Sequence, residues 1–241
     1  MRAETRHQLK TDRFTQATIG AAEATAHWTA EHKGKLAAGI GIAAVVIAAV
    51  LGGWYYLSQQ DDKANLKLTK AVRTLQTPVR PAGAPETPNQ PSFVSAQERA
   101  GAAKKQLQDV VDKYPHTHTA DIARYLLGTT AVELGDKATA ERELKDAAAT
   151  RNSDLAGLAK MALAAFYGNN NRTKDAVDIY KGLIDKPTPT VSKVMAQMQL
   201  AGLYESSQQP LEAKRVYEQI VKENPKSQAE AMAQAKLQTM K

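Results

Sequence analysis

The chain has 241 residues, with 32 Lys and Arg against 25 Asp and Glu and no cysteine. The lack of cysteine excludes thiol nucleophiles, disulfides and cysteine-based metal sites. The net charge of +7 comes from scattered side chains, and from residue 58 onward 26 Lys and Arg face 21 Asp and Glu. A nucleic-acid-binding protein carries a clustered basic face instead. We therefore expect no nucleic-acid partner.

The first 34 residues form a basic leader. Its apolar residues fall on one stripe at helical spacing: Phe14, Ala17, Ala21, Ala24 and Trp28. The stripe predicts a short amphipathic helix on the inner face of a membrane. A loosely ordered tail is the alternative.

Residues 35–57, KLAAGIGIAAVVIAAVLGGWYYL, form an apolar run without a charged residue between Lys35 and Asp61. A membrane-spanning helix needs about 20 apolar residues, whereas the apolar core of a signal peptide has about 7–15 and lies near the start of the chain. Trp54, Tyr55 and Tyr56 at the end of the run suit the headgroup level of a bilayer. We expect a single uncleaved transmembrane anchor at 35–57 rather than a signal peptide or a buried core helix.

The charges on either side of this run predict its orientation. Lys33 and Lys35 precede it, and Asp61 and Asp62 follow it. An excess of Lys and Arg marks the cytoplasmic side. We expect a single-pass protein with its N-terminus in the cytoplasm and its C-terminal domain on the extracytoplasmic side of the membrane, which in a Gram-negative bacterium is the periplasmic side of the inner membrane.

Three further segments follow the anchor. Residues 58–76 have a helical pattern that continues from it. Residues 77–92, TPVRPAGAPETPNQPS, are rich in proline and predict an extended loop, because each proline removes a hydrogen-bond donor and fixes φ. Residues 93–241 are helix-favouring stretches separated by breaks such as LGDKA and GNNNRT.

An internal repeat runs through these helices. Four alanines recur at spacings of 37, 36 and 37 residues, and a large apolar residue follows each of them by four positions. The alanines are Ala103, Ala140, Ala176 and Ala213, and the large residues are Leu107, Leu144, Tyr180 and Tyr217. In the preceding helices a large residue is followed directly by a small one at Leu127-Gly128, Leu163-Ala164 and Leu200-Ala201.

Small residues at such positions let two helix axes approach to about 8–10 Å. The pattern resembles the tetratricopeptide repeat, a helical hairpin of about 34 residues. We expect an all-α fold: one transmembrane helix, then a solenoid of such hairpins. Ala64–Gln76 would be the leading helix of the first hairpin, with the Pro-rich loop inserted inside it, and Ser227–Met240 would cap the stack.

No catalytic constellation is present. The chain lacks GxxxxGK[ST], HExxH, GxSxG and GxGxxG. His116 and His118 lie close together, but a metal site needs three or four ligands, so we expect a plain turn there. The sequence predicts a protein that is not an enzyme, with no catalytic residue, no cofactor and no metal site.

The natural binding surface of such a solenoid is the concave face formed by the first helix of each hairpin. The repeat register places six residues there, which form the predicted partner-binding groove: Ile122, Tyr125, Leu158, Met161, Met195 and Met198. Methionine-rich surfaces suit varied hydrophobic partners. The alternative is that these residues pack the core. The Lys and Asn of a carboxylate clamp are missing at these positions.

The order of parts resembles the YfgM-type family of inner-membrane proteins, as does Leu9-Lys10-Thr11-Asp12-Arg13-Phe14 in the leader. The resemblance implies a chaperone-like adaptor beside the protein-translocation channel, with translocating polypeptides, translocon subunits or chaperone subunits, including a prolyl isomerase, as partners. The Pro-rich insert departs from the family pattern. The repeats also resemble those of envelope-assembly proteins. A structural subunit of a larger membrane complex, bound through its span and leader, is therefore the alternative function.

Overall fold

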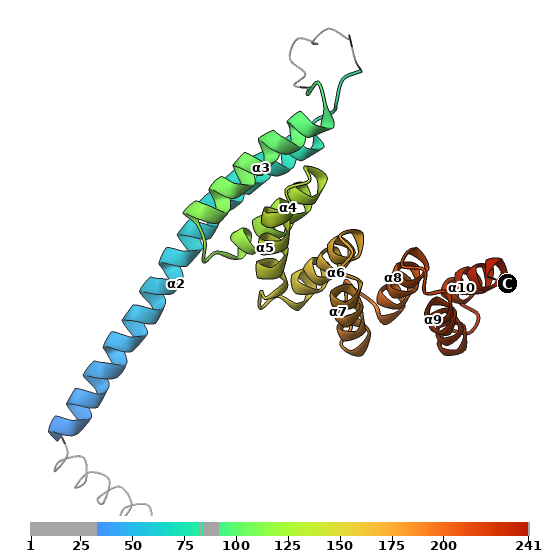
Figure 1. Cartoon of the computed structure of the whole chain (residues 1–241). Helices are drawn as coiled ribbons and strands as arrows, with labels where there is room; N and C mark the ends of the chain where they lie inside the picture. Colours follow the sequence, from blue (N-terminus) through green and yellow to red (C-terminus); the bar gives the residue numbers. More distant parts are fainter. Residues whose placement is uncertain (1–32, 82, 84–91, 241) are drawn as a thin grey trace, which may run out of the picture. The chain divides into compact units, whose positions relative to one another are not determined.

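The computed structural model describes residues 33–81, 83 and 92–240, and its regular elements in that part of the chain are α-helices (Figure 1). The all-α class expected from the sequence is confirmed. The amphipathic stripe of the leader and most of the Pro-rich segment lie outside the described residues. The chain forms two compact units, Met1–Tyr56 and Leu57–Lys241.

Helix α2 (Lys33–Gln76) is a single helix of 44 residues that covers both the expected anchor and the helix after it. In the first unit its apolar side chains are exposed, with 68% of Val45 and 69% of Trp54 accessible. Among the described residues, this is the one helix long and apolar enough to cross a membrane, and none of its most apolar window is buried. A surface of this kind is stable when hydrocarbon covers it.

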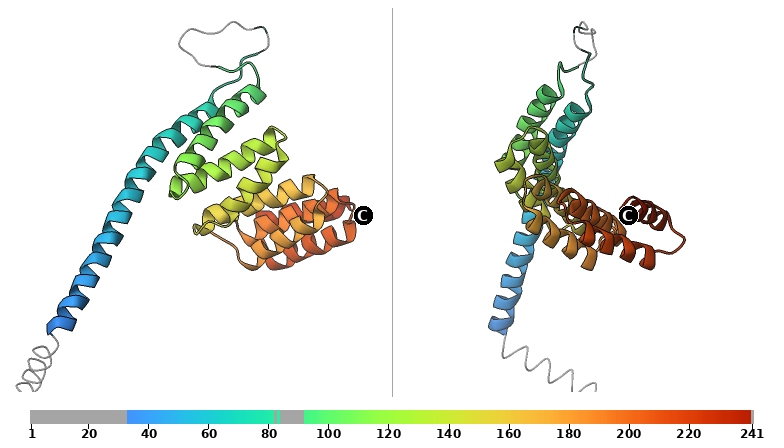
Figure 2. Two further views of the ribbon diagram at one scale, coloured as in Figure 1. Left: turned by 60° about the vertical axis from the view of Figure 1, so that its left-hand side comes forward. Right: turned by 45° about the vertical axis from the view of Figure 1, so that its right-hand side comes forward.

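The second unit is a series of helical hairpins (Figure 2). The first hairpin consists of residues 57–76 of α2 and helix α3; the second, third and fourth are α4–α5, α6–α7 and α8–α9, and α10 packs on α9. The bounds are α3 Ala96–Lys113, α4 His118–Glu133, α5 Lys137–Ala148, α6 Ser153–Asn169, α7 Thr173–Asp185, α8 Lys193–Ser206, α9 Pro210–Glu223 and α10 Gln228–Thr239.

Short polar residues define where most of these helices begin. Ser95, Thr117 and Asp136 each accept a hydrogen bond from a backbone N–H of the first turn of the helix that follows. Asn152, Ser192 and Ser227 do the same for α6, α8 and α10. Such caps satisfy donors that have no partner inside the helix.

The turn inside each of the last three hairpins reverses the chain at one repeated position. Gly135, Asn171 and Gln208 occupy it, with φ values of 72°, 60° and 58°. This left-handed conformation is cheap for Gly, tolerable for Asn and strained for a longer side chain. The repeat is therefore conserved in backbone geometry even where its residues differ.

The repeated small and large residues form the core of the hairpins. All four repeated alanines are fully buried, and so are Leu107 and Leu144, while Tyr180 and Tyr217 are almost so. A Cβ atom on Gly128 would lie 2.7 Å from Cγ of Leu144, which is inside van der Waals contact. The smallest residue thus stands where α4 and α5 come closest.

The core has two parts. The smaller cluster joins α2, α3 and α4 around Leu68, Leu107 and Leu127, and the larger one extends from α4 to α10.

Two backbone hydrogen bonds join the two ends of the Pro-rich segment. The Arg80 N–H donates to the carbonyl of Phe93 over 2.9 Å, and the Phe93 N–H donates to the carbonyl of Pro78 over 3.1 Å. The insertion therefore leaves and rejoins the first hairpin at one place.

Candidate functional site

The six residues of the predicted groove occupy two repeated positions on the first helices. Ile122, Leu158 and Met195 are equivalent to one another in α4, α6 and α8, and Tyr125, Met161 and Met198 are equivalent at the second position. Helix α4 contacts α6, and α6 contacts α8. The six side chains thus follow three neighbouring helices, and we call them the first-helix stripe.

Most of the stripe is partly buried. Tyr125, Leu158, Met161 and Met198 pack against the larger core cluster, and Ile122 packs against the smaller one. Met195 differs, because 44% of its surface is exposed. Five of the six residues therefore pack against the core, and Met195 is the one that is exposed.

The stripe continues onto α10, which sequence reasoning treated only as a cap. Met232 lies 37 residues after Met195, at the same repeated position, and 52% of its surface is exposed. The spacing of the repeat was the signal that could have found it. The most exposed apolar part of the stripe is thus at Met195 and Met232.

Comparison with protein families agrees with this architecture. Residues 26–182, more than half of the chain, match the tetratricopeptide repeat-like domain, and residues 195–227 match the tetratricopeptide repeat. The chain belongs to the tetratricopeptide repeat-like domain family. Neither a search of curated proteins nor a search of solved structures found a match.

Tetratricopeptide hairpins act as protein-interaction scaffolds, and the two hairpin matches support this coarse function for the present chain. Membership also accounts for the repeated first-helix positions, because each hairpin contributes the same places to one surface. It does not select among the partners that the resemblance to the YfgM-type family implies.

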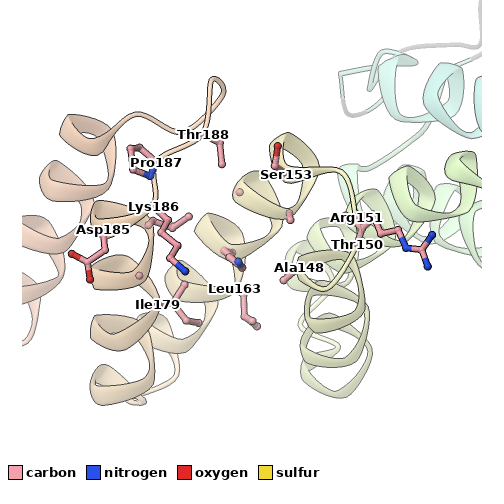
Figure 3. Close-up of a pocket in the computed structure, with 15 residues that line it drawn as sticks. Ala148, Thr150, Arg151, Ser153, Leu163, Ile179, Asp185, Lys186, Pro187 and Thr188 are labelled. Carbon is pink, nitrogen blue, oxygen red and sulfur yellow. The ribbon is translucent and has the colours of Figure 1, made fainter. Parts of the chain in front are cut away.

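The tetratricopeptide-like solenoid also contains a pocket of about 790 Å³ (Figure 3). The end of α5, the α5–α6 turn, α6, α7 and the α7–α8 turn line it, and none of the six stripe residues does. Sequence reasoning did not predict this pocket, which we call the third-hairpin pocket.

The shifted pKa values in the described part of the chain arise from side-chain contacts within and between helices and from burial. Three donors lower the pKa of Glu141 to about 2: Lys145 and Arg172 make the largest contributions, and the Tyr167 hydroxyl adds to them. Burial raises the pKa of Tyr180 to about 12.

Among the described residues, no cluster of three or more His, Cys, Asp or Glu side chains could hold a metal ion. His116 lies in the turn between α3 and α4, and His118 is the first residue of α4.

Proposed function

We propose that this protein is a membrane-anchored, non-enzymatic scaffold that binds polypeptides on the extracytoplasmic side of a bacterial inner membrane. The observation that carries the proposal is the exposed end of the stripe, where Met195 and Met232 present apolar surface to solvent. Methionine side chains adapt to partners of varied shape, which suits a chaperone-like adaptor.

The finer form of the proposal places the scaffold beside the protein-translocation channel. Its partners there are translocating polypeptides and subunits of the translocon or of a periplasmic chaperone network. The support is the resemblance of the leader and of the order of parts to the YfgM-type family. Tetratricopeptide membership is consistent with this role and does not by itself select it.

Orientation in the membrane can be measured directly because the chain has no cysteine. A single cysteine placed by Ala149→Cys lies at an exposed position after α5, and a second variant, Thr5→Cys, marks the leader. A membrane-impermeant maleimide added to cells with a permeabilised outer membrane should label the first variant and spare the second. The reverse labelling would contradict the proposed orientation.

Partner binding is best tested at the exposed stripe residues. Met161 and Met198 are less suitable, because they contact the core and an Asp there would disturb folding. We expect Met195→Asp combined with Met232→Asp to lose partners that are crosslinked in cells and co-isolated with the protein. Leu211→Asp is the matched control, since Leu211 is 73% exposed on a second helix.

The identity of the captured proteins separates the candidate functions. Translocation-channel or periplasmic chaperone subunits, captured by wild type and control but lost in the double variant, support the adaptor. Capture that is unchanged in the double variant, with helix content preserved, excludes the stripe as the binding surface.

A structural subunit of a larger membrane complex is the second candidate. The exposed span favours it, because small residues recur four apart at Ala37/Gly41, Ala44/Ala48 and Ala49/Gly53, a spacing that lets helices approach closely in lipid. Replacing residues 36–57 with an unrelated span of equal length should then break up the complex. A complex that survives this replacement would leave the adaptor as the better description.

A further inference from the structure

The third-hairpin pocket combines an apolar floor with unpaired cations. Leu163 of α6 and Ile179 and Leu183 of α7 contribute apolar side chains, and Lys160 and Lys186 contribute amines. In Figure 3 the Lys186 side chain extends towards Ile179 and Leu163, whereas the Asp185 carboxylate points away from them. No ion pair or side-chain hydrogen bond joins either amine to another of the residues that the structure describes.

The fourth hairpin fills the equivalent place with its own side chains. A shift of 37 residues places Gln197 at the position of Lys160, and Glu223 at the position of Lys186. The Glu223 carboxylate accepts hydrogen bonds of 3.0 Å from Gln197, Lys193 and Gln219. These donors lower its pKa to about 2.

Two of those donors have no counterpart in the third hairpin. Lys193 corresponds to Ala156, and Gln219 corresponds to Gly182; both of these small residues line the pocket. A Cβ atom on Gly182 would meet nothing within 4 Å. The pocket therefore exists because the side chains that occupy this place in the next hairpin are missing here.

The second hairpin also supplies a carboxylate at this place. A shift of 36 residues makes Arg124 equivalent to Lys160, and Thr150 equivalent to Lys186. Asp121 accepts hydrogen bonds from both, over 3.4 Å from Arg124 and 2.6 Å from Thr150. The residue of α6 that corresponds to Asp121 is Gly157, so the third hairpin lacks this carboxylate too.

In the first hairpin, two lysines form ion pairs with one carboxylate of the second helix. Lys113 is equivalent to Lys186, and Asp109 is equivalent to Gly182. Asp109 lies between two amines, 2.5 Å from Nζ of Lys67 and 2.6 Å from Nζ of Lys113. Both interactions lower the pKa of Asp109. The third hairpin has two lysines and, among its described residues, no carboxylate placed between them.

We propose that the third-hairpin pocket binds an acidic segment of a partner polypeptide, with a side-chain carboxylate between Lys160 and Lys186 and a neighbouring apolar side chain on Leu163 and Ile179. A carboxylate is the group that the other three hairpins place here from their own chain. A volume of about 790 Å³ accepts several residues rather than a single ion. This site shares no lining residue with the first-helix stripe and goes beyond the proposed function.

The test uses the full-length protein in detergent and a fluorescent peptide, acetyl-Gly-Leu-Glu-Leu-Glu-Gly-amide, whose blocked end removes the terminal carboxylate. Binding is followed by fluorescence anisotropy at low salt. We expect Lys160→Gln combined with Lys186→Gln to weaken binding about tenfold. The control, Lys174→Gln combined with Lys181→Gln, makes the same change in net charge on exposed lysines outside the pocket and should leave binding intact.

A second pair of variants adds a side chain at Gly182, which lines the pocket. Gly182→Asp reproduces the Asp109 of the first hairpin and should pair with the pocket lysines, which abolishes peptide binding without lowering the melting temperature. Gly182→Asn has the same shape without the charge and should retain binding. Equal loss in both variants would mean that the effect is steric, and the proposal would be wrong.

Competitors distinguish the chemistry of the ligand. A Gln-for-Glu version of the peptide and inorganic phosphate should fail to compete. Competition by phosphate as strong as that of the peptide would point to a general anion site, and a requirement for a free C-terminal carboxylate would point to a chain end; either result overturns the proposal. The absence of any binding to wild type at about 1 mM peptide, which corresponds to only about 4 kcal/mol of affinity, also overturns the proposal.

The Met195→Asp variant should bind the peptide normally, which separates this test from the test of the first-helix stripe.

Discussion

The Tyr167 hydroxyl donates a hydrogen bond to Oε1 of Glu141 over 3.0 Å, which joins the first helix of the third hairpin to the second helix of the second hairpin. The Arg172 guanidinium lies 3.9 Å from the centre of the Tyr167 ring and donates to the same Oε1 over 2.8 Å. One carboxylate thus receives two donors from the next hairpin, beside Lys145 on its own helix. Contacts of this kind hold the register between successive hairpins.

Stability should therefore depend on the charge of Glu141. Its pKa of about 2 in the folded protein lies below the ordinary value of 4.5, so its contribution is complete above about pH 5 and is lost as the pH falls towards 2. We expect Glu141→Gln to cost about 1–2 kcal/mol at pH 7, discounted for partial exposure, and less at pH 3. Melting curves at the two pH values measure the difference. Glu218→Gln, in an exposed pair with Lys214, is the control and should cost less than about 1 kcal/mol.

Close approach within the second hairpin gives a prediction about packing. Gly128→Ala places a methyl group against Leu144 and should destabilise the protein by about 1–3 kcal/mol in denaturant unfolding. Gly101→Ala in α3 meets nothing within 4 Å and should stabilise by up to about 1 kcal/mol. If both substitutions were stabilising, the tight contact between α4 and α5 would be refuted.

The turn inside the second hairpin gives a prediction about backbone conformation. Gly135 has a φ of 72°, and an added Cβ would meet no atom within 4 Å, so Gly135→Ala should lose about 1–2 kcal/mol of stability through backbone conformation alone. Gly202→Ala in α8 is the control, because that glycine is helical with no atom within 4 Å of an added Cβ. The control should be neutral or stabilising when thermal unfolding is compared.

The attachment of α10 can be tested at its one fully buried residue. Ala233→Asp puts an unpaired carboxylate at a position with no exposed surface, and we expect α10 to detach. Limited proteolysis should then cut near Ser227 at protease concentrations that leave wild type intact. The neighbouring exposed variant, Ala235→Asp, should resist like wild type; equal cleavage of both would show that charge on α10, rather than burial of Ala233, weakens it.

The hairpins could be predicted because their signals are local and periodic. Ala140 and Leu144 lie one turn apart on one helix face, and the same pair of positions recurs as Ala176 and Tyr180 with full or nearly full burial. The register derived from them also placed the stripe residues on the correct helices. It missed Met232 because α10 has no second helix to complete a hairpin.

The repeat pattern of the sequence could not predict the third-hairpin pocket, for a physical reason. It is created by side chains that are absent, at Ala156 and Gly182, and neither small residue recurs through all the hairpins at the repeat spacing, so the pattern of small residues does not mark them. Only the structure shows that Ala156 and Lys160 of α6 line the same pocket as Gly182 of α7 and Lys186, which follows α7. The hydrogen bonds that Glu223 accepts in the fourth hairpin then identify the missing group as a carboxylate.

The neighbour-only packing of the hairpins has a consequence for how the second unit opens. Helix α10 rests on α9, α9 on α8, and α8 on α7 and α6, so releasing one hairpin exposes the hairpin before it. The free energy of opening should then rise stepwise from the C-terminal end inward, and amide hydrogens should exchange in the same order. A scaffold built in this way can fray at its far end and rejoin while the hairpin nearest the anchor stays folded.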